Sequence, residues 1–263
     1  MAVNAEFQRA GLSGWRTGLA NLMHKENRAW WGTRRWWVQA LLWTVLVNGV
    51  VAINIFADGV SEESVSMGIA QLFQLGILAL PVGAILLAHA ETIGERQLGV
   101  TEWLLSKPVS RSAYVLSKLF AHGLGVLIIL VALQGAIAYG QAWLALGEPF
   151  PPSPYLVGMA GLAVYTLFYL ALTLMMGVLT ANRPLLLGVS LGALFGGVMV
   201  IALFEKYLGK FVMLTPWCLF NVLPAAVLGA PLPLSIWVPI GVTAVLSVVF
   251  VAVTLARFER LEF

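Results

Sequence analysis

ETIGERQLGVTEWLLSKPVSRSAYVLSK, residues 91–118, is the longest polar interruption between two segments that are apolar enough to cross a bilayer. It holds seven charged side chains in 28 positions, whereas charged residues make up 10% of the whole chain. The stretch therefore separates two membrane helices and offers a surface to an aqueous partner.

Within this stretch the turn-forming residues predict a short separate helix. Gly99 is typical of a helix stop, and Thr101 followed by Glu102 is typical of a helix start. Pro108 ends the helix because proline lacks the N–H that a helix interior needs. The predicted apolar face consists of Trp103, Leu104 and Leu105. A helix of this shape suits docking into a partner, although a solvated loop between two spans is the plainer alternative.

The same residues resemble the first cytoplasmic loop of ABC-2 type transporter permeases. The matching positions are Glu95-Arg96, Gly99, Thr101-Glu102, Leu104-Leu105-Ser106, Pro108-Val109-Ser110-Arg111 and Lys118. Departures from the family pattern are Gln97-Leu98, where further charge is usual, and Val100, which displaces the threonine by one place. The resemblance implies a coupling helix that sits in a groove of a separate ATPase subunit. The residues that it implies for ATPase coupling are Glu91, Glu95, Arg96, Gly99, Thr101, Glu102, Trp103, Leu104, Leu105, Ser106, Pro108 and Arg111.

Composition indicates an integral membrane protein. Hydrophobic residues are 60% of the 263 residues, the mean hydropathy is +0.90, and soluble domains average roughly 45–50% apolar residues. The glycines form neither a P-loop nor a dinucleotide-binding pattern. We therefore expect no cofactor on this chain, with ATP and magnesium held by the partner ATPase. The single cysteine, Cys218, excludes an internal disulfide.

Residues 1–35 are predicted to be a cytoplasmic tail followed by an interfacial helix. From residue 15 to residue 35 apolar side chains recur at helical spacing while basic residues stay on the other face, as in a helix that lies in the headgroup region. Four nearby tryptophans are typical of an interface belt. The resemblance implies an amphipathic elbow helix that touches the ATPase, and a simple basic flank that orients the first span is the alternative.

Residues 36–256 are predicted to be an all-α transmembrane domain of six helices. The chain has six uncharged runs of at least about 20 residues, which is the length that crosses a hydrocarbon core, and it lacks the alternation of a β-barrel. The runs lie near residues 36–56, 68–88, 119–142, 155–181, 185–204 and 235–256. A coupling loop over residues 89–118 and a short cytoplasmic tail over residues 257–263 complete the prediction.

The basic residues predict the orientation in the cytoplasmic membrane. With six spans and both termini inside, 13 of the 15 lysines and arginines lie on the inner side, as the positive-inside rule requires. The outer side then holds Lys206 and Lys210. Within residues 205–234 the apolar stretch 211–230 is nearly long enough for a further span, but Pro216 and Pro224 interrupt it, so we expect an extracellular re-entrant or surface-lying hairpin.

Signatures of enzymes and of ion-coupled carriers are poor. The three histidines lie far apart and lack the spacing of a metal site. Lys118 and His122 are one turn apart and could share a helix face, although a lysine near a helix end can extend to the headgroups. Polar residues inside the spans are neutral. Asn48, Gln71 and Gln74 could line a translocation path, or could form hydrogen bonds between helices, which is the commoner role.

A stripe of small residues in the fifth run predicts close helix packing. Gly188, Gly192 and Gly196 recur at four-residue spacing, which lets helix backbones approach closely. The resemblance implies an interface with a second permease copy, or with a related permease. Packing within one subunit is equally compatible with the stripe.

The sequence is therefore identified as a permease of the ABC-2 type, a transport subunit rather than an enzyme. The resemblance implies ATP-driven export by a dimer with two ATPase subunits in the surrounding lipid. One alternative is a permease-like subunit that transmits force to a periplasmic or membrane partner without moving substrate. Another is a channel or membrane-embedded enzyme outside the ABC class, which the absence of catalytic clusters disfavours. A nucleic-acid partner is not expected.

Overall fold

The computed structural model describes residues 14–97, 100 and 109–260, without the side chains of residues 91–93, 95–97 and 205. Within these residues the chain is helical and contains no strand. The elements are α1 (Leu19–Trp31), α2 (Arg35–Trp43), η1 (Thr44–Asn48), α3 (Gly49–Phe56), α4 (Glu62–Gln97), α6 (Arg111–Val126), η2 (Leu127–Ala132), α7 (Leu133–Leu146), α8 (Pro152–Leu179), α9 (Arg183–Leu208), η3 (Gly209–Leu214), η4 (Pro216–Cys218), α10 (Leu219–Val227) and α11 (Trp237–Glu259).

The prediction of an α-helical bundle with six spans is confirmed. Six helical segments in the described residues are long and apolar enough to cross a membrane, namely Arg35–Phe56, Glu62–Ala90, Arg111–Leu146, Pro152–Leu179, Arg183–Phe204 and Trp237–Glu259. Continuous helices are expected here because lipid offers no hydrogen-bond partner to the backbone, so each helix must satisfy its own N–H and C=O groups. Two of the spans contain a π-helical turn, η1 and η2.

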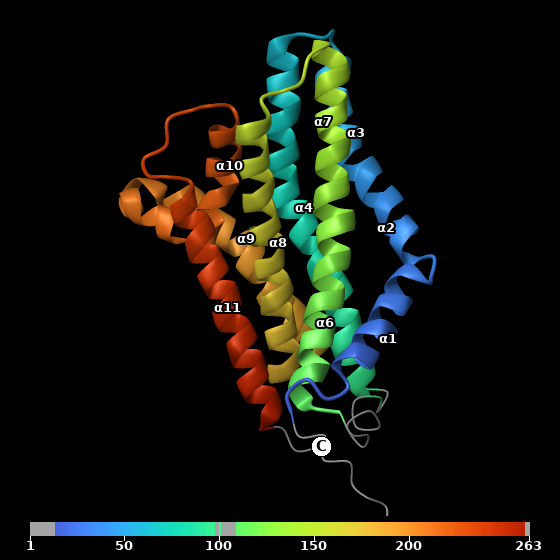
Figure 1. Cartoon of the computed structure of the whole chain (residues 1–263). Coiled ribbons are helices and arrows are strands. Elements are labelled where there is room, and N and C mark those ends of the chain that lie inside the picture. Colours follow the sequence, from blue (N-terminus) through green and yellow to red (C-terminus); the bar gives the residue numbers. More distant parts are fainter. Residues whose placement is uncertain (1–13, 98–99, 101–108, 261–263) are drawn as a thin grey trace, which may run out of the picture.

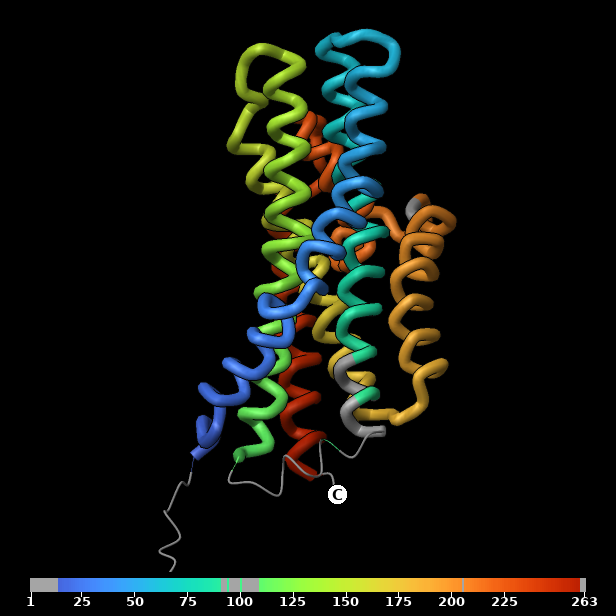
Figure 2. Tube along the Cα trace, turned by 90° about the vertical axis from the view of Figure 1, so that its right-hand side faces the viewer, coloured from blue at the N-terminus to red at the C-terminus, as the bar shows by residue number. Residues whose placement is uncertain are grey.

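The core of the bundle lies between α4 and α8, with α3, α7 and α10 packed around this pair. Phe73 of α4 meets Tyr155 of α8 edge to face, with ring centroids 5.8 Å apart. Gly158 of α8 leaves room for the Phe73 ring, since a Cβ atom there would lie 2.8 Å from ring carbons. Figure 1 shows α4 and α7 rising together beyond α10 and the start of α11. Figure 2 shows α9 at the edge of the bundle.

The segment before the last span is a bent pair of helices. Residues Lys206–Leu214 and Pro216–Val227 meet at 102°, and together they would be long enough for a span only if the bend were ignored. Trp217 connects this helix pair to α8 and α9. Its indole N–H donates to the Tyr169 hydroxyl at 3.1 Å, and its ring fills the space beside Gly197 of α9. The predicted break is thus present at Pro216, whereas Pro224 lies inside α10 and does not interrupt it. The hairpin folds against α8 and α9.

The N-terminal helix is shorter than its apolar pattern predicts. α1 starts after Gly18, whose φ of 78° is left-handed, and it ends at Gly32. α1 packs along α6, and Figure 1 shows the two helices side by side at the lower end of the bundle. Its contact with lipid headgroups and with an ATPase remains a prediction.

Candidate functional site: the predicted coupling surface

The predicted coupling loop lies between the end of α4 and the start of α6. The short helix expected from Thr101 to Lys107, together with Gly99 and Pro108, falls outside the described residues. Glu91, Glu95 and Arg96 belong to the last turns of α4, of whose side chains nothing is described. The described part of the site is therefore the set of helix ends that hold the loop, which lie together at one end of the bundle (Figure 1).

The start of α6 is hydrogen-bonded to the segment that precedes α1. Ser110 caps α6, because its Oγ accepts from the N–H of Ala113 at 3.1 Å. The same hydroxyl donates to the carbonyl of Trp15 at 2.6 Å, and the Ser110 N–H donates to the carbonyl of Thr17 at 3.0 Å. The exit from the coupling loop is therefore fixed to the N-terminal segment.

The start of α6 is also joined to the end of the last span. One guanidinium N–H of Arg111 donates to the carbonyl of Glu259 at 2.6 Å. Cations stabilise helix C-termini, where carbonyls lack partners inside the helix. Tyr114 stacks on Phe258 with ring centroids 5.2 Å apart and planes 11° apart. Arg111, predicted from the resemblance as a coupling residue, thus links two spans in this chain.

A buried charge cluster lies one level deeper, between α1 and α6. Glu26, Lys118 and His122 are 3%, 2% and 2% exposed. Lys118 Nζ lies 3.5 Å from Glu26 Oε1, and His122 Nε2 lies 4.0 Å from Glu26 Oε2. The Trp30 indole donates to His122 Nδ1 at 2.7 Å. Lys118 and His122 therefore do share a face, as their spacing predicted.

The alternative that Lys118 extends to the headgroups is wrong, because its ammonium group faces the buried carboxylate of Glu26. The third span begins at Arg111, eight residues earlier than its uncharged run indicated, and so includes Lys118. Ionisable groups within spans are costly and usually have a role. Removing one partner of a buried ion pair typically costs about 3–5 kcal/mol, because it leaves an uncompensated charge.

Glu26 was missed by sequence reasoning, yet the sequence carries a signal for it. Leu22, Glu26 and Trp30 recur every four residues, so an acid interrupts the apolar stripe of α1. All three are buried against the bundle. A carboxylate on the buried stripe of an amphipathic helix predicts a buried cation on the helix that it covers.

The polar residues predicted for a translocation path are not brought together in one cavity. Asn48 is buried, and its amide donates to Gln134 Oε1 of α7 at 2.7 Å. Gln134 in turn donates to the carbonyl of Ile129 at 3.0 Å. On α4, Gln71 is half-buried and Gln74 is exposed in the single chain. Asn48 thus forms a hydrogen bond between helices, the commoner role of such residues.

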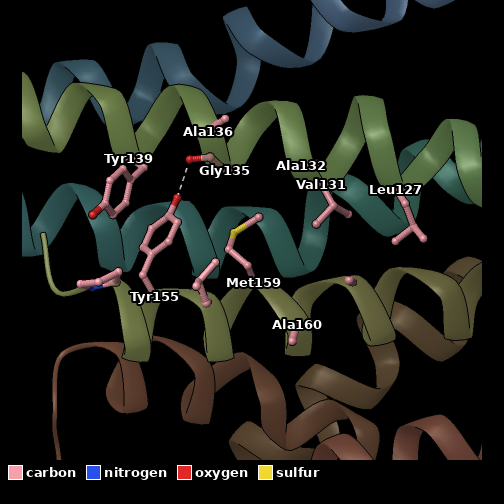
Figure 3. Close-up of a pocket in the computed structure, with 12 residues that line it drawn as sticks. Leu127, Val131, Ala132, Gly135, Ala136, Tyr139, Tyr155, Met159 and Ala160 are labelled. Carbon is pink, nitrogen blue, oxygen red and sulfur yellow. Dashed lines mark hydrogen bonds between the residues drawn. The ribbon is translucent and has the colours of Figure 1, made fainter. Parts of the chain in front are cut away.

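A large groove in the described chain is apolar and lies between α7 and α8 (Figure 3). Its volume is about 720 Å³. The hydroxyl of Tyr155 donates to the carbonyl of Gly135 at 2.6 Å, and that of Tyr139 to the carbonyl of Phe150 at 2.8 Å. Neither Asn48, Gln71 nor Gln74 lines it. The groove therefore offers an apolar surface rather than the polar path that was considered.

The glycine stripe faces away from the other helices of its own chain. Gly188, Gly192 and Gly196 are exposed, and a Cβ atom built on any of them would have no neighbour within 4 Å among the described residues outside the local helix. Within the described chain the stripe is thus not used for packing. This surface of α9 stays open to lipid or to another protein.

Comparison with known proteins places the chain in a family. A family model described as ABC-2 family transporter protein matches residues 20–263. The chain is similar to proteins named probable ABC transporter permease protein NosY from Pseudomonas aeruginosa and from Stutzerimonas stutzeri, each 34% identical over 118 residues. The match covers 44% of this chain and 41% of each relative. With six spans and the matched model extending over nearly its whole length, the chain belongs to the ABC-2 family of multi-pass membrane transporter permeases.

Proposed function

We propose that this chain is the permease subunit of an ATP-driven exporter in the cytoplasmic membrane, with its termini in the cytoplasm. A separate ATPase subunit binds at the predicted coupling helix, residues 101–106, and at the N-terminal elbow helix, holds ATP and magnesium, and changes the arrangement of the spans through these contacts. Such coupling requires that the two ATPase states contact the permease differently.

The observation that carries this proposal is the joining of helix ends around the loop. The exit of the loop at Ser110 is hydrogen-bonded to the segment before α1, and the next residue, Arg111, is bonded to the end of α11. A push on the loop would therefore act on three helices at once. A loop that merely joined two spans would not need this arrangement.

Co-purification tests the proposal. Tagged permease is extracted in detergent, and we expect an ATPase subunit to accompany the wild-type chain and the Leu144→Asp variant. The Leu104→Asp variant should lose it, because a carboxylate would replace an apolar contact in the ATPase groove. Leu144 is the matched control, since it is a leucine 83% exposed at the opposite end of the bundle. Retention of the ATPase by a folded Leu104→Asp variant would contradict the predicted coupling helix.

The exposed face of α9 supports a second permease copy as partner. Besides the three glycines, α9 exposes large apolar side chains, among them Phe195, Met199 and Leu203. Small residues permit close approach of a second helix, while the larger ones beside them supply contact area. The proposed interface therefore runs along α9.

A second candidate function is transmission of force to a partner outside the membrane. α4 has 36 residues and α11 has 23, which correspond to about 54 Å and about 34 Å of helix, against a hydrocarbon core of about 30 Å. The extra length projects at the end away from the coupling surface (Figure 1). The ends of the helices on this side, with the loops between α3 and α4 and between α7 and α8, are called the tips. They expose Val60, Trp143 and Leu144, and the two loops also carry the acidic residues Asp58 and Glu148.

Variants of the tips separate the two functions. If the tips hold a partner, Leu144→Asp combined with Val60→Asp should fail to complement a deletion strain. Permease-dependent ATP hydrolysis should stay at the wild-type level, because the coupling surface is untouched. Full complementation by this double variant would contradict force transmission through the tips and leave export as the function.

A further inference from the structure

We propose that Glu26, Lys118 and His122 are positioning residues that lock α1 onto α6, so that both helices move as one body when the coupling loop is pushed. The inference rests on the proposed function and adds the route of the motion. Three groups of contacts, one above another along the helix pair, hold α1 and the segment before it against α6. At the lowest level, the carbonyl of Trp15 accepts from Ser110, and Val109 packs against Gly18.

The middle group of contacts is formed by the charged side chains of Glu26 and Lys118. The upper group is formed by the Trp30 ring with His122 and Gly125. The Glu26 carboxylate meets Lys118 at 3.5 Å, and the Trp30 indole donates to His122 at 2.7 Å. Gly125 of α6 leaves room for the Trp30 ring, because a Cβ atom there would lie 2.9–3.0 Å from ring carbons. The contacts follow one another in the same order along α1 and α6, so the two helices are paired in parallel over about three turns.

The charges give this pairing a register that apolar contacts alone would not. An apolar stripe can slide or rotate against another with little loss, whereas a shift of one helical turn here would leave Glu26 and Lys118 buried without each other. His122 adds a directional constraint. Its Nδ1 accepts the Trp30 indole N–H at 2.7 Å, which fixes the imidazole ring against α1, and its Nε2 lies 4.0 Å from Glu26 Oε2, beyond hydrogen-bond distance. The carboxylate is thus paired with Lys118, and His122 binds α1 through Trp30.

The lock between α1 and α6 determines which spans move when the coupling loop is displaced. α1 ends at Trp31, and the first span begins at Arg35, with only three residues between them. If α1 follows α6 rigidly, a displacement that enters at Ser110 reaches the first span as well as the third. If α1 can slip, the displacement stays in α6. A rigid α1–α6 pair would carry such a displacement to both spans as one unit.

Distances between spin labels test the lock directly. Labels are placed at the exposed positions of Asn21→Cys on α1 and Leu124→Cys on α6, in a Cys218→Ser background. The wild-type pair should give one narrow distance distribution in nanodiscs without nucleotide. Glu26→Gln should broaden it, because Lys118 and His122 lose the carboxylate. Lys25→Gln is the matched control, since Lys25 lies 3.4 Å from the same carboxylate but is 44% exposed; its distribution should stay narrow.

The second measurement uses the complex with its ATPase, free of nucleotide and then trapped with ATP and vanadate. The wild-type distance should not change between the two states, whereas in Glu26→Gln it should. If Glu26→Gln does not fold, Glu26→Gln with Lys118→Gln removes both charges and should show the same broadening and the same change. A narrow distribution in the folded cluster variants, or a wild-type distance that shifts on trapping, would overturn the inference. Failure of the wild-type chain to bind any ATPase would instead contradict the proposed function, while the nucleotide-free measurement still decides whether the lock exists.

Discussion

At the scale of single residues, the polar groups inside the spans are arranged by mutual hydrogen bonding. Asn48 ends the π-helical turn η1, and it reaches Gln134 of α7. Its own carbonyl accepts from the Gln141 side chain at 3.3 Å. Turns of π-helix are frequent at sites where a helix departs from regular geometry for a purpose. Here the irregular turn lies where the first span is joined to the third.

Removal of the Asn48 amide should destabilise the protein modestly. We expect Asn48→Leu to lower the free energy of unfolding by about 1–2 kcal/mol, because Gln134 Oε1 loses its donor in a buried site. Asn48→Leu combined with Gln134→Leu should cost less than the sum of the two single changes. A double-mutant cycle, measured by reversible denaturation in mixed micelles, gives this interaction energy.

Asn54→Leu is the control for the Asn48 cycle. Asn54 lies on the same span, is exposed, and donates to the carbonyl of Val50 within its own helix, at 2.9 Å. Its replacement should therefore change the free energy of unfolding little. An additive cycle between Asn48 and Gln134 would show that their hydrogen bond contributes no interaction energy.

At the scale of the elements, α9 differs from α4 and α8 in how little of it the chain covers. Of the spanning windows, 28% of the α9 window is buried, against 56% for α4 and 67% for α8. In the membrane an exposed apolar face is ordinary, since lipid solvates it. The glycines distinguish this face, because small residues let the backbone of a second helix approach closely. A lipid chain gains less from this exposed backbone than a second helix does.

A leucine in the middle of the glycine stripe should weaken self-association without harming the fold. For Gly192→Leu we expect fewer dimers, because the side chain separates the two backbones, while thermal stability stays near that of the wild type. Single-molecule photobleaching in liposomes counts the copies. Gly241→Leu is the matched control, since Gly241 is an exposed glycine of α11 that also has open space at its Cβ position. Equal dimer fractions in both variants would contradict an interface along the stripe.

At the scale of the whole molecule, an even number of spans predicts that both ends of the chain lie on one side of the membrane. The structure agrees in that α1, the end of α4, the start of α6 and the end of α11 lie at one end of the bundle (Figure 1). The loops at Asp58 and Glu148 lie at the other end. The side of the membrane to which each end belongs is predicted from the basic residues.

Labelling of single cysteines checks this orientation. In a Cys218→Ser background, Asp58→Cys and Glu148→Cys should react with a membrane-impermeant maleimide on intact cells. Asn182→Cys, in the short turn between α8 and α9, should react only after the cells are permeabilised. Reaction of Asn182→Cys in intact cells, with protection of Glu148→Cys, would reverse the proposed orientation.

The number of spans and the break before the last span follow from the sequence alone. Six runs without charge had to become helices, because the bilayer leaves the backbone no other partner. Pro216 correctly predicted the interruption between the fifth and sixth spans, whereas Pro224, predicted to interrupt it as well, lies inside α10. The family resemblance of residues 91–118 was equally local, since it rests on residues adjacent in the chain.

The three-dimensional neighbours of side chains could be found only from the tertiary structure. Glu26 was not predicted as a buried residue, and although its spacing from Leu22 and Trp30 places it on their stripe, periodicity could not assign it Lys118 and His122, which follow some 90 residues later. Nor could the glycine spacing on α9 show whether the stripe faces inward or outward, because a small-residue stripe permits close packing without specifying the partner. Bilayer length and backbone hydrogen bonding act within one segment, so the sequence determines the spans. Burial, charge pairing and the open face of α9 depend on how the segments meet, and only the folded chain decides them.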